Sequence, residues 1–361
     1  MMKQLFKNKE QQLKFEKDGY LILPILNQNE VASLANYYHS FNLKHEKGYG
    51  FHVSMDRLDK DVCAEIQATI WDNILPKLDH YIENYKSFVA NFIVKESYSL
   101  GFVPAHQDWS FVDKEDAGYY SITCWTALVD TTIDSGCMGV IKGSNTFLKN
   151  HRPSPSPQTP VPLSEHKFSI FPYLKPLEMK AGETLFFDNR TFHASPPNTN
   201  SDIRLIASIG ITHKDAELIH YYLKPDGNKN TLLKYKVDED FFLKYYNARL
   251  SEMYNKGEVI TDYEVVEEIH YTCEEITSEA MINMIKQAGN EYNESLKKKL
   301  DVLLPDELSG HNKIETEFES EKVAKPKIYP QQAAWADSRA FFKIYTPKNI
   351  LREIKHKLTG K

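Results

Sequence analysis

The sequence predicts an α+β fold with a mainly β core, of the barrel or jelly-roll kind, flanked by helices. Two observations predict it. Short strand-like segments separated by turns rich in Gly, Pro and Asn occupy residues 87–212, where alternating β and α units would place helical patterns between strands. Helical patterns precede this region and follow it.

Composition narrows the class of protein. The 361 residues are enough for one large domain or two, and 41% are hydrophobic, so a sizeable core can form. The formal net charge of −6 argues against nucleic acid as the main partner. No apolar run predicts a membrane span or a signal peptide. The four cysteines show neither metal-ligand nor disulfide spacing, so we expect a reducing, cytoplasmic setting.

Four elements are predicted before the strand-rich region. They are a helix, a strand and two further helices: Glu10–Asp18, Tyr20–Leu26, Glu30–Phe41 and Val62–Tyr85. Gly19 ends the first helix, and Asn29 caps the second. The last helix is predicted from apolar residues that recur every four positions: Ile66, Ile70, Ile74 and Leu78.

The strand-rich region contains six predicted strands and two loops. The strands are Ser87–Val94, His106–Phe111, Tyr119–Val129, Met138–Lys142, Leu185–Asp188 and Arg204–Thr212. Asp113–Gly118 is predicted to be a polar turn or lid. Asn150–Pro162 contains five prolines, which exclude a helix or a central strand, so we expect a long surface loop over the mouth of a site.

The character of the chain changes after Leu223. Residues 238–321 include 21 acidic and 8 basic residues, a formal charge of −13. An apolar stripe at helical spacing runs through them: Met281, Ile282, Ile285, Ala288, Tyr292 and Leu296. We expect an acidic helical extension that packs on the core.

The last residues form a predicted linker and a basic tail. Leu308–Pro330 has little periodicity, whereas Arg339–Lys361 has a formal charge of +6 and one apolar helical face. This amphipathic tail either packs on the acidic helices or makes a peripheral contact with an anionic membrane surface. The predicted division of the chain is a core domain over residues 1–225, an extension over 226–307, and a linker and tail over 308–361.

Three residues have the types and spacing of a metal site. His106 and Asp108 are two positions apart, so in a strand both side chains lie on one face. His193 would complete a set of two histidines and one carboxylate, which leaves open positions on Fe(II). Each signal alone is weak, because a His-x-Asp is common in surface loops. Three other histidines lack a carboxylate at matching spacing and are interpreted as surface or pocket-rim residues: His39, His45 and His52.

An arginine follows the last candidate ligand at a distance that would allow it to lie on a neighbouring strand. Arg204 lies eleven residues after His193 and opens the apolar run Leu205–Ile209. From a neighbouring strand, an arginine can hold a carboxylate through two parallel hydrogen bonds. A metal with open positions beside such a group suits 2-oxoglutarate, which chelates iron at one end and carries a free carboxylate at the other.

These motifs resemble the phytanoyl-CoA dioxygenase family of non-haem Fe(II)/2-oxoglutarate oxygenases. The resemblance extends from about Asp18 to Thr212 and is carried by Asp18–Pro24, His106–Asp108, Cys124–Leu128, Ser135–Ser144, His193–Ser195, Asn198–Thr199 and Arg204. It implies a double-stranded β-helix, a jelly roll of the cupin kind. The chain departs from the family's frequent Gly-Ser-His at Gly143-Ser144-Asn145, which touches no expected ligand.

The resemblance also assigns roles to site residues. It implies that His106, Asp108 and His193 hold the iron. It implies that the far carboxylate of 2-oxoglutarate is bound by Arg204 and Ser195. Two further candidate cofactor-binding residues are Trp125, which would line that pocket, and Gln107.

The implied activity is the hydroxylation of an unactivated C–H bond of a small molecule, with release of succinate and CO2. Asp108 favours hydroxylation, because related halogenases have a small residue at this place. The alternatives are the same cofactor chemistry ending in desaturation, epimerisation or cyclisation, and a non-catalytic cupin-like binding protein. The primary substrate and the oligomeric state do not follow from the sequence. We expect specificity to lie in the loops Leu43–Leu58, Asp113–Gly118 and Asn150–Pro162.

Overall fold

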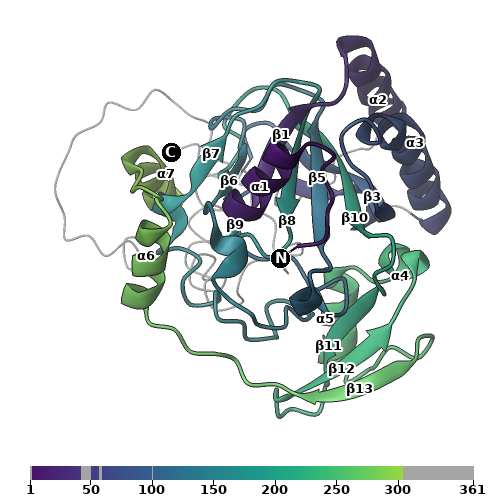
Figure 1. Cartoon of the computed structure of the whole chain (residues 1–361), viewed down its shortest axis with the longest axis vertical. Coiled ribbons are helices and arrows are strands. Elements are labelled where there is room, and N and C mark those ends of the chain that lie inside the picture. Colours follow the sequence, from purple (N-terminus) through teal and green to yellow (C-terminus); the bar gives the residue numbers. More distant parts are fainter. Residues whose placement is uncertain (1, 42–49, 57–58, 100, 304–361) are drawn as a thin grey trace, which may run out of the picture.

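Two antiparallel sheets form the centre of the computed structural model, which describes residues 2–41, 50–56, 59–99 and 101–303 (Figure 1). The larger sheet has the order β1-β8-β5-β10-β3-β2, with β1 Tyr20–Pro24, β8 Glu183–Asp188, β5 Ser121–Ala127, β10 Arg204–His213, β3 Tyr85–Lys95 and β2 Phe51–Val53. The smaller has the order β4-β9-β6-β7, with β4 Val103–His106, β9 His193–Ser195, β6 Met138–Val140 and β7 Lys175–Leu177.

The chain passes back and forth between these two sheets. Strands β3, β5, β8 and β10 belong to the larger sheet, and β4, β6, β7 and β9 belong to the smaller one. Apolar side chains from both sheets share one buried cluster, including Trp125 and Ile206 from the larger sheet and Val140 from the smaller. This arrangement is a double-stranded β-helix, so the predicted fold class is confirmed.

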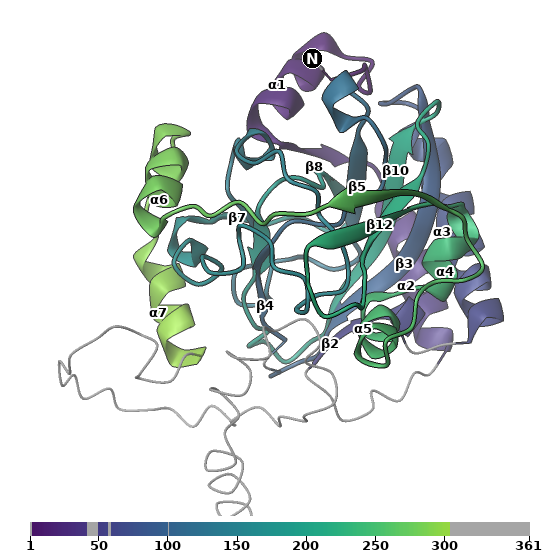
Figure 2. The ribbon, with the colours of Figure 1, turned by 90° about the horizontal axis from the view of Figure 1, so that it is seen from below.

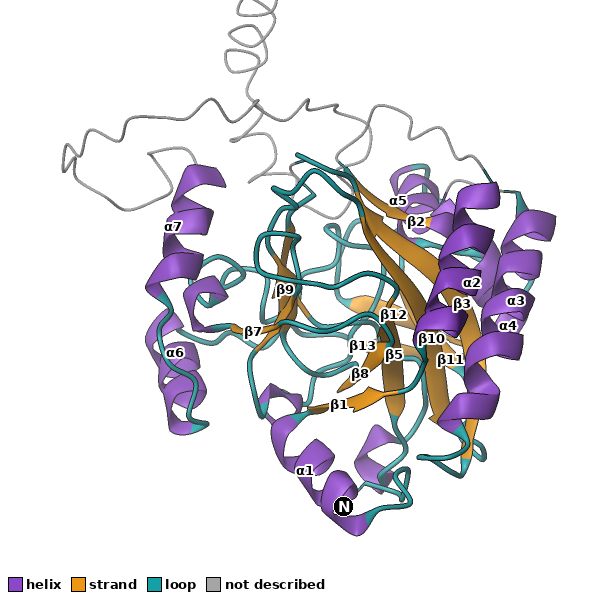
Figure 3. Ribbon diagram, turned by 90° about the horizontal axis from the view of Figure 1, so that it is seen from above, coloured by secondary structure: helices purple, strands orange, loops and turns teal. Residues whose placement is uncertain are grey.

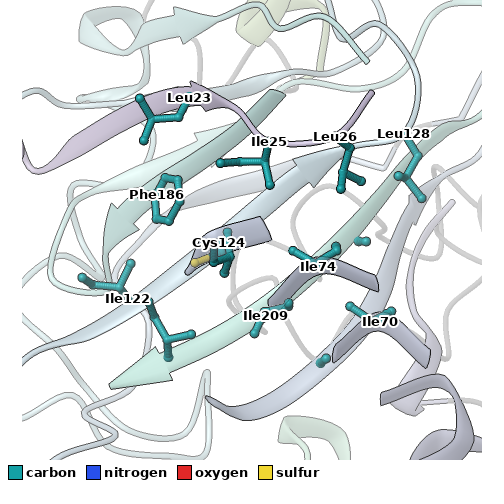
Figure 4. Packing of buried hydrophobic residues seen from close by; sticks show 14 of the residues in the cluster. Leu23, Ile25, Leu26, Ile70, Ile74, Ile122, Cys124, Leu128, Phe186 and Ile209 are labelled. Atoms are coloured by element: carbon teal, nitrogen blue, oxygen red, sulfur yellow. The ribbon is translucent and has the colours of Figure 1, made fainter. Parts of the chain in front are cut away.

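Helices cover the outer face of the larger sheet. They are α2 Gln28–Ser40 and α3 Lys60–Leu78, with α1 Lys9–Asp18 near the N-terminus (Figure 3). Ile70 and Ile74 of α3 pack against Ile209 and Cys124 of the sheet, as Figure 4 shows. The four-residue apolar stripe therefore predicted both the helix and its buried face.

Two predicted helix boundaries were wrong. The cap of α2 is Asn27, not Asn29. The Asn27 side chain accepts hydrogen bonds from the N–H groups of Asn29 and Glu30, and the Glu30 carboxylate accepts one from the Asn27 N–H. Helix α3 ends at Leu78 rather than at residue 85. Ile82 continues the four-residue apolar spacing, but it pairs with Phe6 in an isolated β-bridge, and β3 begins at Tyr85.

The proline-rich segment 150–162 is a loop, but the prediction that it lies on the surface was only partly correct. Arg152, Pro153 and Ser154 are buried. Ser154 is bonded to β11 (Ile219–Leu223) through its N–H to Tyr221 and its carbonyl to Leu223. Prolines have no N–H group, so burying them leaves no backbone donor without a partner.

The segment after residue 225 was predicted to be helical, and this is only partly correct. Strands β12 Thr231–Lys236 and β13 Val265–His270 pair with β11 in a third sheet. Four helices lie around and after them: α4 Glu239–Lys244, α5 Asn247–Asn255, α6 Ser278–Gln287 and α7 Glu294–Leu303. The predicted single stripe is split between α6 and α7, because Gly289 takes a left-handed conformation between them.

Helices α6 and α7 flank the smaller sheet, opposite α2 and α3 (Figure 2). Met281, Ile285 and Leu296 are buried there in one apolar cluster with Phe171. The predicted linker and basic tail, residues 308–361, lie outside the described residues. Among the residues described, no helix combines the length and apolar character needed to cross a membrane.

Candidate metal centre

His106, Asp108 and His193 converge on one point. One possible ligand atom from each lies within 4.8 Å of the other two. The Asp108 Oδ1 atom is 3.8 Å from His106 Nε2 and 3.6 Å from His193 Nε2. His106 and His193 are register partners at the ends of β4 and β9, which places their rings 4.2 Å apart. The three side chains could hold a single ion.

Backbone carbonyls orient both imidazoles. His106 Nδ1 donates to the Pro104 carbonyl at 2.9 Å, and His193 Nδ1 donates to the Thr191 carbonyl at 2.9 Å. With Nδ1 protonated, each neutral ring presents the Nε2 lone pair to the centre. Burial and the neighbouring His193 lower the pKa of His106 to about 4, so this ligand is neutral at pH 7.

Asp108 lies beside the two histidines, but it is not on a strand as predicted. Strand β4 ends at His106, so Asp108 lies in the following loop and not on the same strand face. Its N–H donates to the Asn189 carbonyl at 3.0 Å, and its Oδ2 accepts from Asn189 Nδ2 at 2.7 Å. Thr123 Oγ1 accepts from the same amide at 2.8 Å. Asn189, which sequence reasoning missed, therefore fixes the carboxylate and leaves Oδ1 facing the histidines.

This contact gives a testable prediction. We expect Asn189→Ala to keep the fold but lower metal affinity by roughly 10- to 100-fold, the usual effect of removing a partner that orients a ligand. Fe(II) titration without O2 measures this affinity, with Asn200→Ala as the exposed control. Wild-type affinity in Asn189→Ala would show that Asp108 is oriented by other groups.

Arg204 is a buried cation that lines the same cavity as the three candidate ligands. Its side chain is 1% exposed, and among the described residues no acidic group pairs with it. One terminal nitrogen donates to the Gly136 carbonyl at 2.5 Å, the guanidinium lies 5.0 Å from the Trp125 ring centre, and Nε has no partner. Burial lowers the pKa of Arg204 to about 9, so it stays charged at pH 7. A buried guanidinium without an acidic partner could bind a carboxylate.

A second buried basic residue, Lys95, is the register partner of Arg204 across β3 and β10. Its ammonium donates to the Ser195 carbonyl at 3.2 Å and to the Pro196 carbonyl. Burial and Arg204 hold the pKa of Lys95 well below its ordinary value. A lysine that ends the apolar run of β3 was the signal that could have drawn attention to it.

The three candidate metal ligands and Arg204 line one cavity with a volume of about 310 Å³, and the other predicted site residues line it too. Trp125 and Ser195 are buried beside Arg204, at 1% and 4% exposure. Gln107 also lines the cavity, but its amide donates to the Arg190 carbonyl at 2.6 Å. His52, interpreted as a surface or rim residue, is buried and lies 2.6 Å from Glu96. His45 lies outside the described residues.

Arg152, in the third of the three predicted specificity loops, connects that loop and the second one to the metal centre. Its Nε donates to the Asp108 carbonyl at 2.8 Å, and its terminal nitrogens donate to the Glu115 carboxylate at 3.0 and 2.7 Å. The proline-rich loop and the turn around Glu115 are thus held against the backbone of a candidate ligand. The sequence offered no signal for this, because the partners are 37 and 44 residues apart.

Two histidines and one carboxylate beside a buried arginine, inside a double-stranded β-helix, define the class of Fe(II)/2-oxoglutarate oxygenases. The chain belongs to the phytanoyl-CoA dioxygenase (PhyH) family, whose model matches residues 15–206, more than half of the chain. Iron and 2-oxoglutarate are the cofactors typical of this family, and the donor set and the arginine without an acidic partner fit them.

Individual relatives are more distant. A phytanoyl-CoA dioxygenase domain-containing protein 1 homolog from Dictyostelium discoideum is 28% identical over 134 residues, which cover 36% of this chain and 47% of that protein. The match thus spans about half the length of that relative.

Among solved structures, the carbocyclase SnoK from nogalamycin biosynthesis is 17% identical and has a TM-score of 0.45, over 58% of this chain and 86% of that one. HygX from Streptomyces hygroscopicus is 14% identical and has a TM-score of 0.43, over 56% and 86%. These are remote similarities in fold.

Proposed function

We propose that this protein is an Fe(II)/2-oxoglutarate-dependent hydroxylase of a small molecule. His106, Asp108 and His193 would hold the iron, and Arg204 with Ser195 and Trp125 would bind the far carboxylate of 2-oxoglutarate. When bound, iron, 2-oxoglutarate and O2 supply the oxidation of an unactivated C–H bond with release of succinate and CO2. The observation that carries the proposal is that a complete ligand set and a buried arginine without an acidic partner line one cavity.

The residues of the chain contribute binding and orientation. The Pro104 and Thr191 carbonyls fix the two imidazoles, and Asn189 fixes the Asp108 carboxylate. The Trp125 ring packs beside the planar Arg204 guanidinium, which could donate two parallel hydrogen bonds to a carboxylate. The buried walls around this pair exclude water, which strengthens the attraction between the guanidinium and a carboxylate.

A substrate screen tests the proposal. Fe(II)-loaded protein would be incubated with 2-oxoglutarate, O2 and a library of small molecules, and succinate would be measured together with product mass. A gain of one oxygen atom in the product supports hydroxylation. Loss of two hydrogens indicates desaturation or cyclisation, and an unchanged mass with inverted configuration indicates epimerisation. Binding of 2-oxoglutarate without any succinate from the library would point to a non-catalytic binding protein.

Asp108 gives a sharper prediction. We expect Asp108→Gly to lose hydroxylation, because only two protein ligands remain and Asn189 is left facing an empty position. Turnover would be measured with and without chloride, because loss of the carboxylate frees a ligand position for a halide. Hydroxylation at the wild-type rate in Asp108→Gly would show that Asp108 is not a ligand.

The family name identifies neither the substrate nor the cellular compartment of this protein. Related enzymes share the cofactors and differ in the loops around the cavity. We propose a cytoplasmic, reducing setting, supported by the four cysteines, all of which are free thiols. We also propose that residues 1–225 form the oxygenase domain and that residues 226–307 are an extension of it.

A further inference from the structure

The far wall of the cavity comes from the segment after residue 225, outside the residues that match the family. Phe242, Tyr245, Tyr246 and Asn247 line the same cavity as the candidate metal ligands. They lie in α4, at the start of α5 and in the turn between them. This extension therefore takes part in the site rather than only packing on the core.

The wall is aromatic and continuous. Phe242 from α4 lies 5.0 Å from Phe88 of β3 and 5.6 Å from Phe111, and Phe88 and Phe111 lie 5.1 Å apart. Trp109, next to the candidate ligand Asp108, lies 6.3 Å from Phe111. All four rings line the cavity, so an aromatic surface runs from the metal centre to the extension.

A glycine makes room for this surface. A Cβ atom on Gly210 would lie 2.7 Å from Phe88 Cζ and 2.8 Å from Val89 Cγ1. Gly210 itself lines the cavity, so any larger residue there would force Phe88 or Val89 to shift.

The extension also holds the proline-rich loop over the cavity. Asn247 Oδ1 accepts from the Ser156 N–H at 2.9 Å, and Asn247 Nδ2 donates to the Ser156 carbonyl at 2.7 Å. Ser251 adds a bond to the same carbonyl at 3.3 Å. Ser156 and Thr159 of this loop line the cavity, so the loop and the extension form one fixed boundary.

Few charged side chains line the cavity apart from the candidate ligands and Arg204. Within the part of the chain that the structure describes, the charged lining residues away from the ligands and Arg204 are Asp56, Arg152 and Lys167. Arg152 is paired with Glu115, and both Asp56 and Lys167 have interaction partners. These residues form no cluster of cations that could bind a phosphate-bearing or coenzyme A-linked substrate.

We infer that the extension selects the substrate, and that the substrate is a neutral, largely apolar molecule with a ring that packs on the Phe88–Phe111–Phe242 surface. The inference rests on the proposed function, because it concerns the second ligand of the same cavity. Aromatic side chains bind flat apolar groups through large contact areas and favourable edge-to-face or offset geometry.

Two neighbouring phenylalanines provide a matched test. Phe242 and Phe241 are both buried in α4, at 4% and 0% exposure, but only Phe242 lines the cavity. The full-length protein would be loaded with Fe(II) and 2-oxoglutarate without O2 and titrated by calorimetry with 2-naphthalenemethanol. Glucose and glucose 6-phosphate serve as the hydrophilic and the charged probe.

We expect 2-naphthalenemethanol to bind the wild type at least tenfold more tightly than either sugar. Phe242→Leu should weaken this binding by about five- to tenfold, while Phe241→Leu leaves it unchanged. Melting temperatures of both variants report any general loss of stability. Tighter binding of a sugar, or equal weakening by the two substitutions, would overturn the inference.

The same preparations keep the two proposals apart. Titration with 2-oxoglutarate before the probe is added measures the cosubstrate site alone. Normal 2-oxoglutarate binding with no response to 2-naphthalenemethanol rejects the aromatic substrate class and leaves the oxygenase proposal standing. Absent 2-oxoglutarate binding with a Phe242-dependent probe response rejects the oxygenase proposal and leaves the aromatic binding surface.

Discussion

His193→Ala is expected to abolish iron binding and all turnover. His193 would supply one of the three proposed protein ligands, and its Nε2 lies 3.6 Å from Oδ1 of Asp108. Two remaining ligands cannot complete the facial set that leaves the other positions open for cosubstrate and O2. Iron content should fall from about one ion per chain to near zero, and succinate formation should fall to the background rate.

The control for this variant is His213→Ala. His213 is also a buried histidine, at 7% exposure, but it lies at the far end of β10 and faces Asp215 rather than the triad. It should keep wild-type iron content even if it costs a similar amount of stability. Full iron occupancy in His193→Ala, measured on protein with a cooperative melting transition, would contradict the ligand assignment.

Replacing Arg204 should separate cosubstrate binding from metal binding. Arg204→Ala removes two charge-assisted hydrogen bonds, so 2-oxoglutarate affinity should fall by about 100-fold or more. Arg204→Lys keeps the charge but loses the planar fork and the stacking on Trp125, so we expect an intermediate loss of about tenfold. Iron affinity should stay at the wild-type value in both variants.

The graded order of the two variants is the diagnostic result. A cavity left in the core would weaken both variants according to side-chain volume and would lower their melting temperatures. A lost carboxylate contact instead lowers 2-oxoglutarate affinity while iron affinity holds. An unchanged 2-oxoglutarate titration in both Arg204→Ala and Arg204→Lys would refute the assignment.

The metal residues could be predicted from the sequence because the order, spacing and context of His106, Asp108 and His193 point to one site together, although each signal alone is weak. The geometric reason given for them was only partly right. His106 and His193 meet as register partners of two strands, but Asp108 is placed by Asn189 from a loop. A bond between residues 81 positions apart leaves no local pattern, so no spacing argument could have found it.

The helices and the sheet core were predicted because apolar periodicity reports directly on burial. The errors arose where tertiary contacts override local chemistry. Five prolines marked a loop correctly. Arg152 in this loop is buried through contacts with Glu115 and Asp108, which are distant in the sequence and leave no local pattern. Phe242 looked like an ordinary core aromatic, and only the fold brings it to the cavity that holds the candidate ligands.

The most direct test of the account is anaerobic calorimetry of 2-oxoglutarate with metal-free and Fe(II)-loaded protein. We expect one equivalent of 2-oxoglutarate to bind the Fe(II)-loaded protein and about tenfold or more weaker binding without metal, because iron and Arg204 would each hold one end of the molecule. Equal binding with and without Fe(II), or no binding in either case, would contradict the claim that this cavity is a 2-oxoglutarate site built on His106, Asp108 and His193.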